Sequence, residues 1–116
     1  MKILIVDDNP EARLLLRMQL ESNAHEVVGE AETLARAVAL YKEAKPQFVV
    51  LDLTLEREDG LTILRQLRQL DTKARVIILS ANGMERIKRE ALDAGAAAYL
   101  IKPLEEQELL SLLRPE

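Results

Sequence analysis

Hydrophobic positions along the chain follow two alternating patterns. Short apolar runs rich in β-branched residues predict strands that are covered on both faces. They occupy residues 3–6, 48–51, 76–79 and 98–101, and a weaker run at 26–31 has a charged residue near each end. Between these runs, apolar residues recur at the spacing of three and four that is typical of helices. Five strand–helix pairs in strict alternation predict an α/β domain with one parallel sheet and helices on both faces.

Capping and turn residues predict where the helices begin and end. The first helix is predicted to begin at Asn9-Pro10 and to end near Glu21, and the second to begin at Thr33 and to end at Lys45-Pro46. The third is predicted to begin at Asp59-Gly60. The fourth is predicted to begin with a capping box of Asn82 and Glu85 and to end at Gly95, and the last is predicted to span residues 105–113. The residues expected on the buried side of the first helix are Ala12, Leu15, Leu16 and Leu20.

Composition limits the class of protein. The chain has 116 residues, which suits a single domain spanning residues 1–116. A net charge of −4 argues against direct nucleic-acid binding by this domain. There is no cysteine, so disulfides and thiol chemistry are excluded. The apolar run at 3–6 is too short for a signal peptide and no stretch could span a bilayer, so we expect a cytoplasmic protein without membrane insertion.

Polar side chains follow four of the predicted strands. They are Asp7-Asp8, Asp52, Ser80 and Lys102. Each has an ordinary explanation on its own, as a helix-end charge, a turn residue or a solvated lysine. Together they are harder to explain in this way, because a parallel sheet places the carboxyl ends of its strands at one edge, where open α/β sheets bind their ligands.

The expected charges at this edge favour a bound cation. Adjacent strands lie about 4.8 Å apart, and two carboxylates roughly 5 Å apart repel by about 3 kcal/mol at an effective dielectric of 20. Lys102 offsets one of the three acidic charges, and a divalent cation would offset the remainder. Ligands that are all oxygen favour Mg²⁺ over zinc. A cation, a lysine and a hydroxyl around Asp52 are the parts that hold a phosphoryl group, and Asp52 could then be the nucleophile that forms an acyl phosphate.

With these motifs the chain resembles, over its whole length, the receiver domain of two-component response regulators. The resemblance rests on an acidic pair after the first strand, Asp52 after the third, Ser80-Ala81 after the fourth, Lys102-Pro103 after the fifth, and Tyr99 three residues before the lysine. It implies a doubly wound, flavodoxin-like sheet of five strands in the order 2-1-3-4-5.

The resemblance also implies residue roles. Asp52 would be the phosphoacceptor; Asp8 and Asp52 would bind Mg²⁺ directly, Asp7 would bind it through water, and the backbone carbonyl of Thr54 would complete the protein ligands. Lys102 and Ser80 would contact the phosphoryl group, Ala81 would leave room for it, and Ser80 with Tyr99 would act as the switch. The phosphoryl donor would be a sensor histidine kinase or a phosphotransfer protein. The fourth helix, fifth strand and last helix would form the face that binds a downstream protein, and the same face could bind a second copy of the chain.

One segment departs from the family pattern, and several alternatives stay open. Leu55-Glu56 replace the usual Met-Pro, which bears on loop rigidity and phosphorylation rate. A stand-alone regulator of the CheY kind is favoured over the receiver of a longer DNA-binding regulator. A receiver would catalyse only its own phosphorylation and dephosphorylation. A phosphatase of the haloacid dehalogenase type would need a second Asp where Thr54 stands. A scaffold that never takes phosphate would not need the complete set of site residues.

Overall fold

Strands and helices alternate along the whole chain in the computed structural model, which describes residues 1–53, 55, 59–103 and 105–115. The strands are β1 (Lys2–Val6), β2 (Glu26–Ala31), β3 (Phe48–Asp52), β4 (Val76–Ser80) and β5 (Ala98–Ile101). The helices are α1 (Pro10–Glu21), α2 (Leu34–Ala44), α3 (Gly60–Leu70), α4 (Glu85–Asp93) and α5 (Glu106–Leu110). All neighbouring strands pair in parallel, in the order β2-β1-β3-β4-β5. This arrangement confirms the predicted fold class and strand order.

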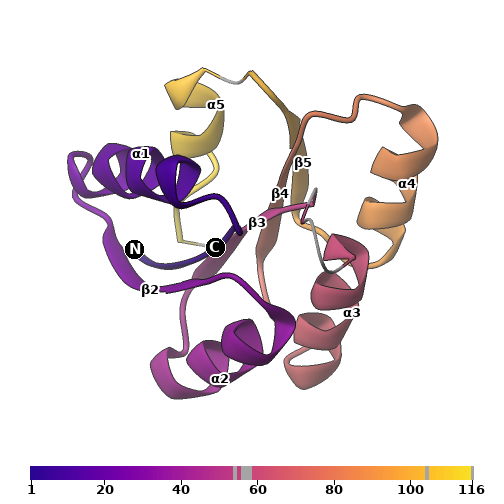
Figure 1. Ribbon diagram of the computed structural model, residues 1–116, viewed down its shortest axis with the longest axis horizontal. Coiled ribbons are helices and arrows are strands. Elements are labelled where there is room, and N and C mark those ends of the chain that lie inside the picture. Colours follow the sequence, from indigo (N-terminus) through magenta and orange to yellow (C-terminus); the bar gives the residue numbers. More distant parts are fainter. Residues whose placement is uncertain (54, 56–58, 104, 116) are drawn as a thin grey trace.

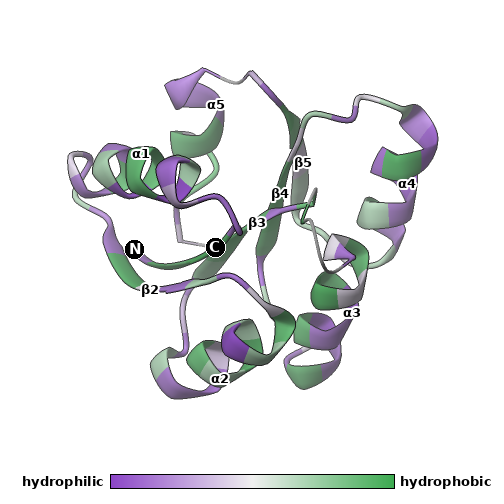
Figure 2. Ribbon diagram, viewed as in Figure 1, coloured by the Kyte–Doolittle hydropathy of each residue, from purple (hydrophilic) through white to green (hydrophobic). Residues whose placement is uncertain are grey.

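Helices cover both faces of the sheet (Figure 1). Helices α1 and α5 lie on one face, and α2, α3 and α4 lie on the other. Because successive side chains of a strand point to opposite faces, residues of one strand enter two separate cores: Leu4 packs with the core on the α2–α4 side, whereas Ile3 and Ile5 pack with the core on the α1 and α5 side. Figure 2 shows long hydrophobic stretches in the central strands, whereas the edge strand β2 also carries hydrophilic stretches.

Burial along the strands follows their place in the sheet. Every residue of β3 and β4 is buried, and β1 is exposed only at its first residue. The edge strands β2 and β5 are buried only in part. The central strands therefore need apolar side chains on both faces, which explains why their uninterrupted apolar runs predict them correctly.

Most predicted helix boundaries are confirmed, and the capping contacts show why. Asn9 Oδ1 accepts hydrogen bonds from the backbone N–H groups of Glu11 and Ala12 at the start of α1. Thr33 and Asp59 cap α2 and α3 in the same way. Gly95 follows α4 with a φ of 105°, a conformation that favours glycine.

The predicted capping box of α4 is wrong. The residue at the N-cap is Met84, which makes no capping hydrogen bond through its side chain. Asn82 Oδ1 instead accepts from the N–H of Met84 at 2.9 Å, so the asparagine closes a turn two residues before the helix. The sequence motif was therefore correct about a local side chain–backbone bond and wrong about its register.

Two further expectations about the helices are corrected. Leu15 is 68% exposed, whereas Leu20 is fully buried, because α1 covers the sheet with a narrower face than its apolar residues suggest. The last helix ends at Leu110 instead of residue 113, although Leu113 still packs into the core beside Leu109. No helix in the described ranges is long and apolar enough to cross a membrane.

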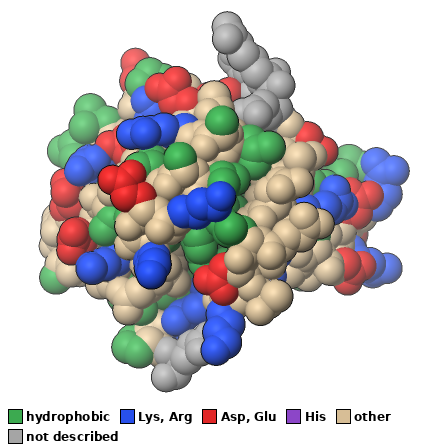
Figure 3. Space-filling view, turned by 90° about the horizontal axis from the view of Figure 1, so that it is seen from below, with side chains coloured by type: hydrophobic (Ala, Val, Ile, Leu, Met, Phe, Trp, Pro, Cys, Tyr) green, Lys and Arg blue, Asp and Glu red, His purple; other side chains and the backbone are tan. Residues whose placement is uncertain are grey.

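Acidic and basic side chains are interspersed on the face drawn in Figure 3, with small apolar areas between them. This face carries no continuous basic surface of the kind that binds a nucleic-acid backbone.

Candidate functional site

The carboxyl ends of the central strands bring the predicted site residues to one edge of the sheet. Asp52 is the last residue of β3 and is 8% exposed, and Ser80 is the last residue of β4 and is fully buried. Asp7 follows β1 and is 5% exposed. These three are the only buried polar or charged residues within the described ranges. Among the described residues, the buried acids and the buried serine therefore gather at the edge where the sequence predicts a site.

Lys102, which follows β5, reaches across β4 to the carboxylate of Asp52. Its Nζ lies 3.1 Å from Asp52 Oδ2, in a geometry that is both a hydrogen bond and an ion pair. The side chain of Asp52 is 10% exposed and that of Lys102 is 35% exposed, so the ammonium enters the site from the solvent side. The Lys102–Pro103 peptide bond is cis.

Electrostatic crowding at this edge shows in the titration of Asp7. Burial raises the pKa of the Asp7 carboxyl above its ordinary value of 3.8, and the neighbouring carboxylates of Asp52 and Asp8 raise it further. Two contacts act the other way and lower this pKa: the N–H of Asn9, which donates to Asp7 Oδ1 at 2.9 Å, and the positive charge of Lys102. The raising causes prevail, so ionised Asp7 is held in an unfavourable environment.

The chemistry of this donor set fits a hard divalent cation. Three ionised aspartates and one lysine sum to a charge of −2 (−3 + 1), and all the acidic ligands are oxygens, which Mg²⁺ prefers. As they stand, the described side chains include no group of three or more such ligands placed to hold a metal ion. A bound cation would therefore have to draw Asp7, Asp8 and Asp52 closer and to use water and further protein oxygens. The predicted backbone ligand, Thr54, lies outside the described residues.

Ser80 and Tyr99 are linked through the loop that precedes α4. Ser80 Oγ accepts a hydrogen bond from the N–H of Asn82 at 3.0 Å, and the hydroxyl of Tyr99 donates to the carbonyl of Asn82 at 2.6 Å. Tyr99 is only 7% exposed, so its ring points inward. A cavity of about 180 Å³ lies beside this loop. Its lining residues are Leu53, Asp59, Leu61, Ser80, Asn82 and Ile87.

The sequence and the fold of this chain resemble those of known proteins. A family model described as the response regulator receiver domain matches residues 3–114. The chain belongs to the response regulator receiver domain family.

Relatives of this receiver domain include short and long proteins. The chemotaxis protein CheY of Bacillus subtilis is 39% identical over 112 residues, which cover 97% of this chain and 93% of that protein. The KDP operon transcriptional regulatory protein KdpE of Escherichia coli is 44% identical over 112 residues, which cover 97% of this chain and 49% of that protein. Among solved structures, the CheX–CheY–BeF₃–Mg²⁺ complex from Borrelia burgdorferi contains a chain that is 32% identical to this one, with a TM-score of 0.90. The match covers 96% of this chain and 84% of that chain. Because both kinds of protein match, the preference for a stand-alone regulator stays a prediction.

Two further features of the predicted site in this receiver domain are the small residue Ala81 and the pair Leu55-Glu56. Ala81 follows Ser80 and is exposed. This position is compatible with the expectation that its small side chain leaves room for the phosphoryl group. Leu55 packs, partly buried, against the core on the α2–α4 side. Glu56, the other residue that departs from the family pattern, lies outside the described residues.

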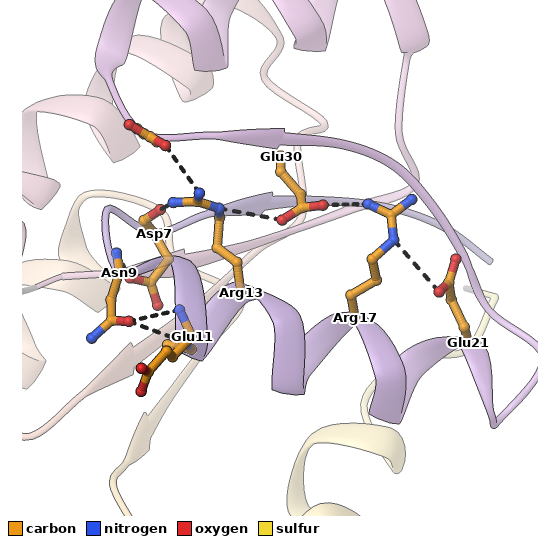
Figure 4. Close-up of polar contacts among 9 residues, drawn as sticks. Asp7, Asn9, Glu11, Arg13, Arg17, Glu21 and Glu30 are labelled. Carbon is orange, nitrogen blue, oxygen red and sulfur yellow. Dashed lines mark hydrogen bonds and ion pairs between the residues drawn. The ribbon is translucent and has the colours of Figure 1, made fainter.

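Sequence reasoning missed Arg13, the residue of α1 that contacts the acidic pair. Its guanidinium donates to the backbone carbonyl of Asp7 at 2.7 Å and forms an ion pair with Glu30 (Figure 4). It forms a second ion pair with Glu32. The only available signal was its place one helical turn after Asn9, combined with acidic residues at the end of the second predicted strand.

Proposed function

We propose that this receiver domain is a phosphorylation-dependent signalling switch in which Asp52 accepts a phosphoryl group from the phosphohistidine of a sensor kinase or a phosphotransfer protein. The observation that carries the proposal is the contact between Lys102 Nζ and Asp52 Oδ2 at 3.1 Å, at the end of a strand that is buried throughout. A buried carboxylate held by a flexible cation is suited to become an acyl phosphate, because the lysine can follow the developing negative charge.

In the transfer step, an Asp52 oxygen forms a bond to phosphorus while the phosphorus–nitrogen bond of the donor breaks. The imidazole leaves with the electron pair and takes up a proton. Lys102 can contact the phosphoryl oxygens from its present position by a small movement, and Ser80, at the end of the next strand, can donate its hydroxyl hydrogen to another oxygen. When Mg²⁺ is bound through Asp8 and Asp52, with Asp7 acting through water, it supplies positive charge that offsets the phosphoryl oxygens.

The change of state would spread through Ser80 and Lys102. A charge-assisted hydrogen bond contributes about 1.5–3 kcal/mol, so two contribute about 3–6 kcal/mol. A shift from 1:99 to 99:1 needs about 5.5 kcal/mol, so both contacts are needed for a nearly complete shift. Any movement of Ser80 toward the phosphoryl group pulls on the loop at Asn82, to which Tyr99 is hydrogen-bonded.

The surface that would respond is formed by α4, β5 and α5. Met84, Leu92 and Ile101 are large apolar residues on this surface that are more than two-fifths exposed. Exposed apolar residues beside the switch loop support its use for binding a downstream protein, and for a dimer as a second use. The relative in the Borrelia burgdorferi structure was solved as a complex of CheY with CheX, with BeF₃ and Mg²⁺. We further infer that the domain acts in the cytoplasm and turns over no external substrate.

The test is intact-mass measurement after incubation with acetyl phosphate and Mg²⁺. We expect one added phosphoryl group in the parent, none in Asp52→Asn, and one in Glu105→Gln, an exposed acid at the start of α5. Loss of the gain in Asp8→Ala at ordinary Mg²⁺ concentration would support the metal role of that residue. A mass gain that persists in Asp52→Asn refutes the assignment, and catalytic release of phosphate from a generic ester would favour the phosphatase alternative.

A further inference from the structure

Arg13 connects three elements around the acidic pair. It lies in the second turn of α1, and its side chain is only 12% exposed. One terminal nitrogen donates to the backbone carbonyl of Asp7 at 2.7 Å, Nε donates to Glu30 at 3.2 Å, and the other terminal nitrogen donates to Glu32 at 2.9 Å. Figure 4 shows the guanidinium between the end of β1 and the strand β2. Each of its three nitrogens is therefore used by a different partner.

The contact with Asp7 matters because this carbonyl belongs to the peptide unit that joins Asp7 to Asp8. The rest of the segment is also held: the N–H of Asp7 donates to the carbonyl of Ala31 at 3.0 Å, and the N–H of Asn9 donates to Asp7 Oδ1 at 2.9 Å. The Arg13 contact restrains the plane of the peptide between the two acids, because it holds the carbonyl oxygen of that peptide. Rotation of that plane would swing the Asp8 side chain relative to Asp52.

We propose that Arg13 is a positioning residue for the acidic pair that would bind Mg²⁺: it holds the peptide that joins Asp7 to Asp8 and so restricts the orientation of both carboxylates relative to Asp52. This inference rests on the proposed function and deepens it by naming what orients the predicted Mg²⁺ ligands. Arg13 does not need its charge to act at the site, because Glu30 and Glu32 already pair with it. What it contributes is a planar fork with donors in fixed directions, which lysine cannot reproduce.

Arg17 provides a matched control within the same network. It lies one turn further along α1 and pairs with the same Glu30, as well as with Glu21 at 3.5 Å (Figure 4). Among the described residues Arg17 pairs with acidic side chains, whereas Arg13 also holds a backbone carbonyl at the site. Loss of either arginine should loosen the packing of α1 on β2, but only loss of Arg13 should disturb the acidic pair.

The experiment measures Mg²⁺ affinity by calorimetric titration and stability by urea unfolding, both without any phosphoryl donor. Replacing groups that orient metal ligands typically lowers affinity by 10–100-fold. We expect Arg13→Lys and Arg13→Gln to raise the Kd for Mg²⁺ by about tenfold or more. Arg17→Gln should leave this Kd within about twofold of the parent, although it should shift the urea midpoint by about as much as the Arg13 variants do. Amide exchange at Asp8 and Asn9 should become faster in the Arg13 variants only.

Each other outcome has a defined meaning. If Arg13→Lys binds Mg²⁺ as the parent does, or if Arg17→Gln weakens binding equally, the positioning role is refuted. If the parent itself binds no Mg²⁺, the role is refuted as well. If the parent binds Mg²⁺ with the expected dependence on Arg13 but gains no phosphoryl group on Asp52, the inference about Arg13 stands and the proposed function fails. Arg13→Lys keeps the charge and most of the stem, so it is the variant to rely on if Arg13→Gln does not fold.

Discussion

Replacing Asp7 by Asn should stabilise this domain in the absence of Mg²⁺. Asp7 is 5% exposed, and burial, Asp52 and Asp8 together raise its pKa. Asparagine has nearly the same shape and keeps an oxygen that can accept from the N–H of Asn9, so the hydrogen bond of 2.9 Å can persist. The substitution therefore removes a charge from a crowded site without removing the local structure around it.

The size of the effect follows from the charges involved. Two unit charges about 6 Å apart, on neighbouring strand ends, repel by about 3 kcal/mol at an effective dielectric of 20. The attraction between Asp7 and Lys102 offsets part of this repulsion. We therefore expect a gain of about 1–3 kcal/mol in the free energy of unfolding. For a domain of this size, each kcal/mol raises Tm by about 4 °C.

The pH dependence has a defined sign. Because the pKa of Asp7 is raised above 3.8 in the folded protein, the stability linked to this group is complete at lower pH and is lost as pH rises through the folded-state pKa. The advantage of Asp7→Asn over the parent should accordingly be smallest near pH 4 and should increase toward neutral pH.

Thermal and urea unfolding between pH 4 and 8, with and without Mg²⁺, are the assays. Mg²⁺ should stabilise the parent, by about 2.7 kcal/mol at one hundred times its Kd, and should stabilise Asp7→Asn less, so the difference narrows as Mg²⁺ is added. Glu105→Gln, at an exposed position, should change stability by less than about 0.5 kcal/mol. A variant that is less stable than the parent at pH 7 without Mg²⁺ would show that the carboxylates at this edge do not repel one another enough to matter.

Three further substitutions test two local features: the close packing at Gly60, with Gly83 as its control, and the buried hydroxyl of Tyr41. Gly60→Ala should destabilise the domain by about 1–3 kcal/mol in urea unfolding, because a Cβ there would lie 2.7 Å from the carbonyl oxygen of Leu53. At Gly83 the nearest atom to a Cβ would be in the Ile101 side chain at 3.5 Å, so Gly83→Ala should destabilise the domain less. Tyr41 donates to Asp71 Oδ2 at 2.8 Å, and burial, followed by this contact, raises the pKa of Tyr41 above its ordinary value of 10.0. The parent should therefore lose stability as pH rises beyond about 10, and Tyr41→Phe should lose less. Urea midpoints from pH 8 to 11 measure the difference. Equal alkaline slopes in the two proteins would contradict this assignment.

The sequence predicts the secondary structure well where one local cause decides it. Continuous apolar runs predict β3 and β4 because both faces of these strands are buried, and the caps at Asn9, Thr33 and Asp59 form within three residues. The register of α4 could not be obtained in this way, because Asn82 can close a turn or cap a helix with the same local bond. The strand order needed the family resemblance, since alternation alone allows several orders.

Long-range contacts explain what the sequence left out. Arg13 meets partners 17 and 19 positions away, on and just after a neighbouring strand, and its place one helical turn after Asn9 does not by itself identify these partners. The switch role of Tyr99 stays a prediction from the resemblance, and its inward orientation depends on the carbonyl of Asn82 in a loop that local rules do not place. The exposure of Leu15 likewise depends on how α1 lies on the sheet.

The described structure divides the site into a side that is held and a side that can respond. Asp7 is held by Arg13, Asn9 and Ala31, on strands and a helix that are tied together by ion pairs. On the other side of Asp52, Lys102 follows the short edge strand β5 and is about one-third exposed. Lys102 and the loop after Ser80 would therefore move toward a phosphoryl group on Asp52 more easily than the acidic pair, which stays in place. That asymmetry gives a physical reason for the proposed signal to leave through α4, β5 and α5 instead of through α1.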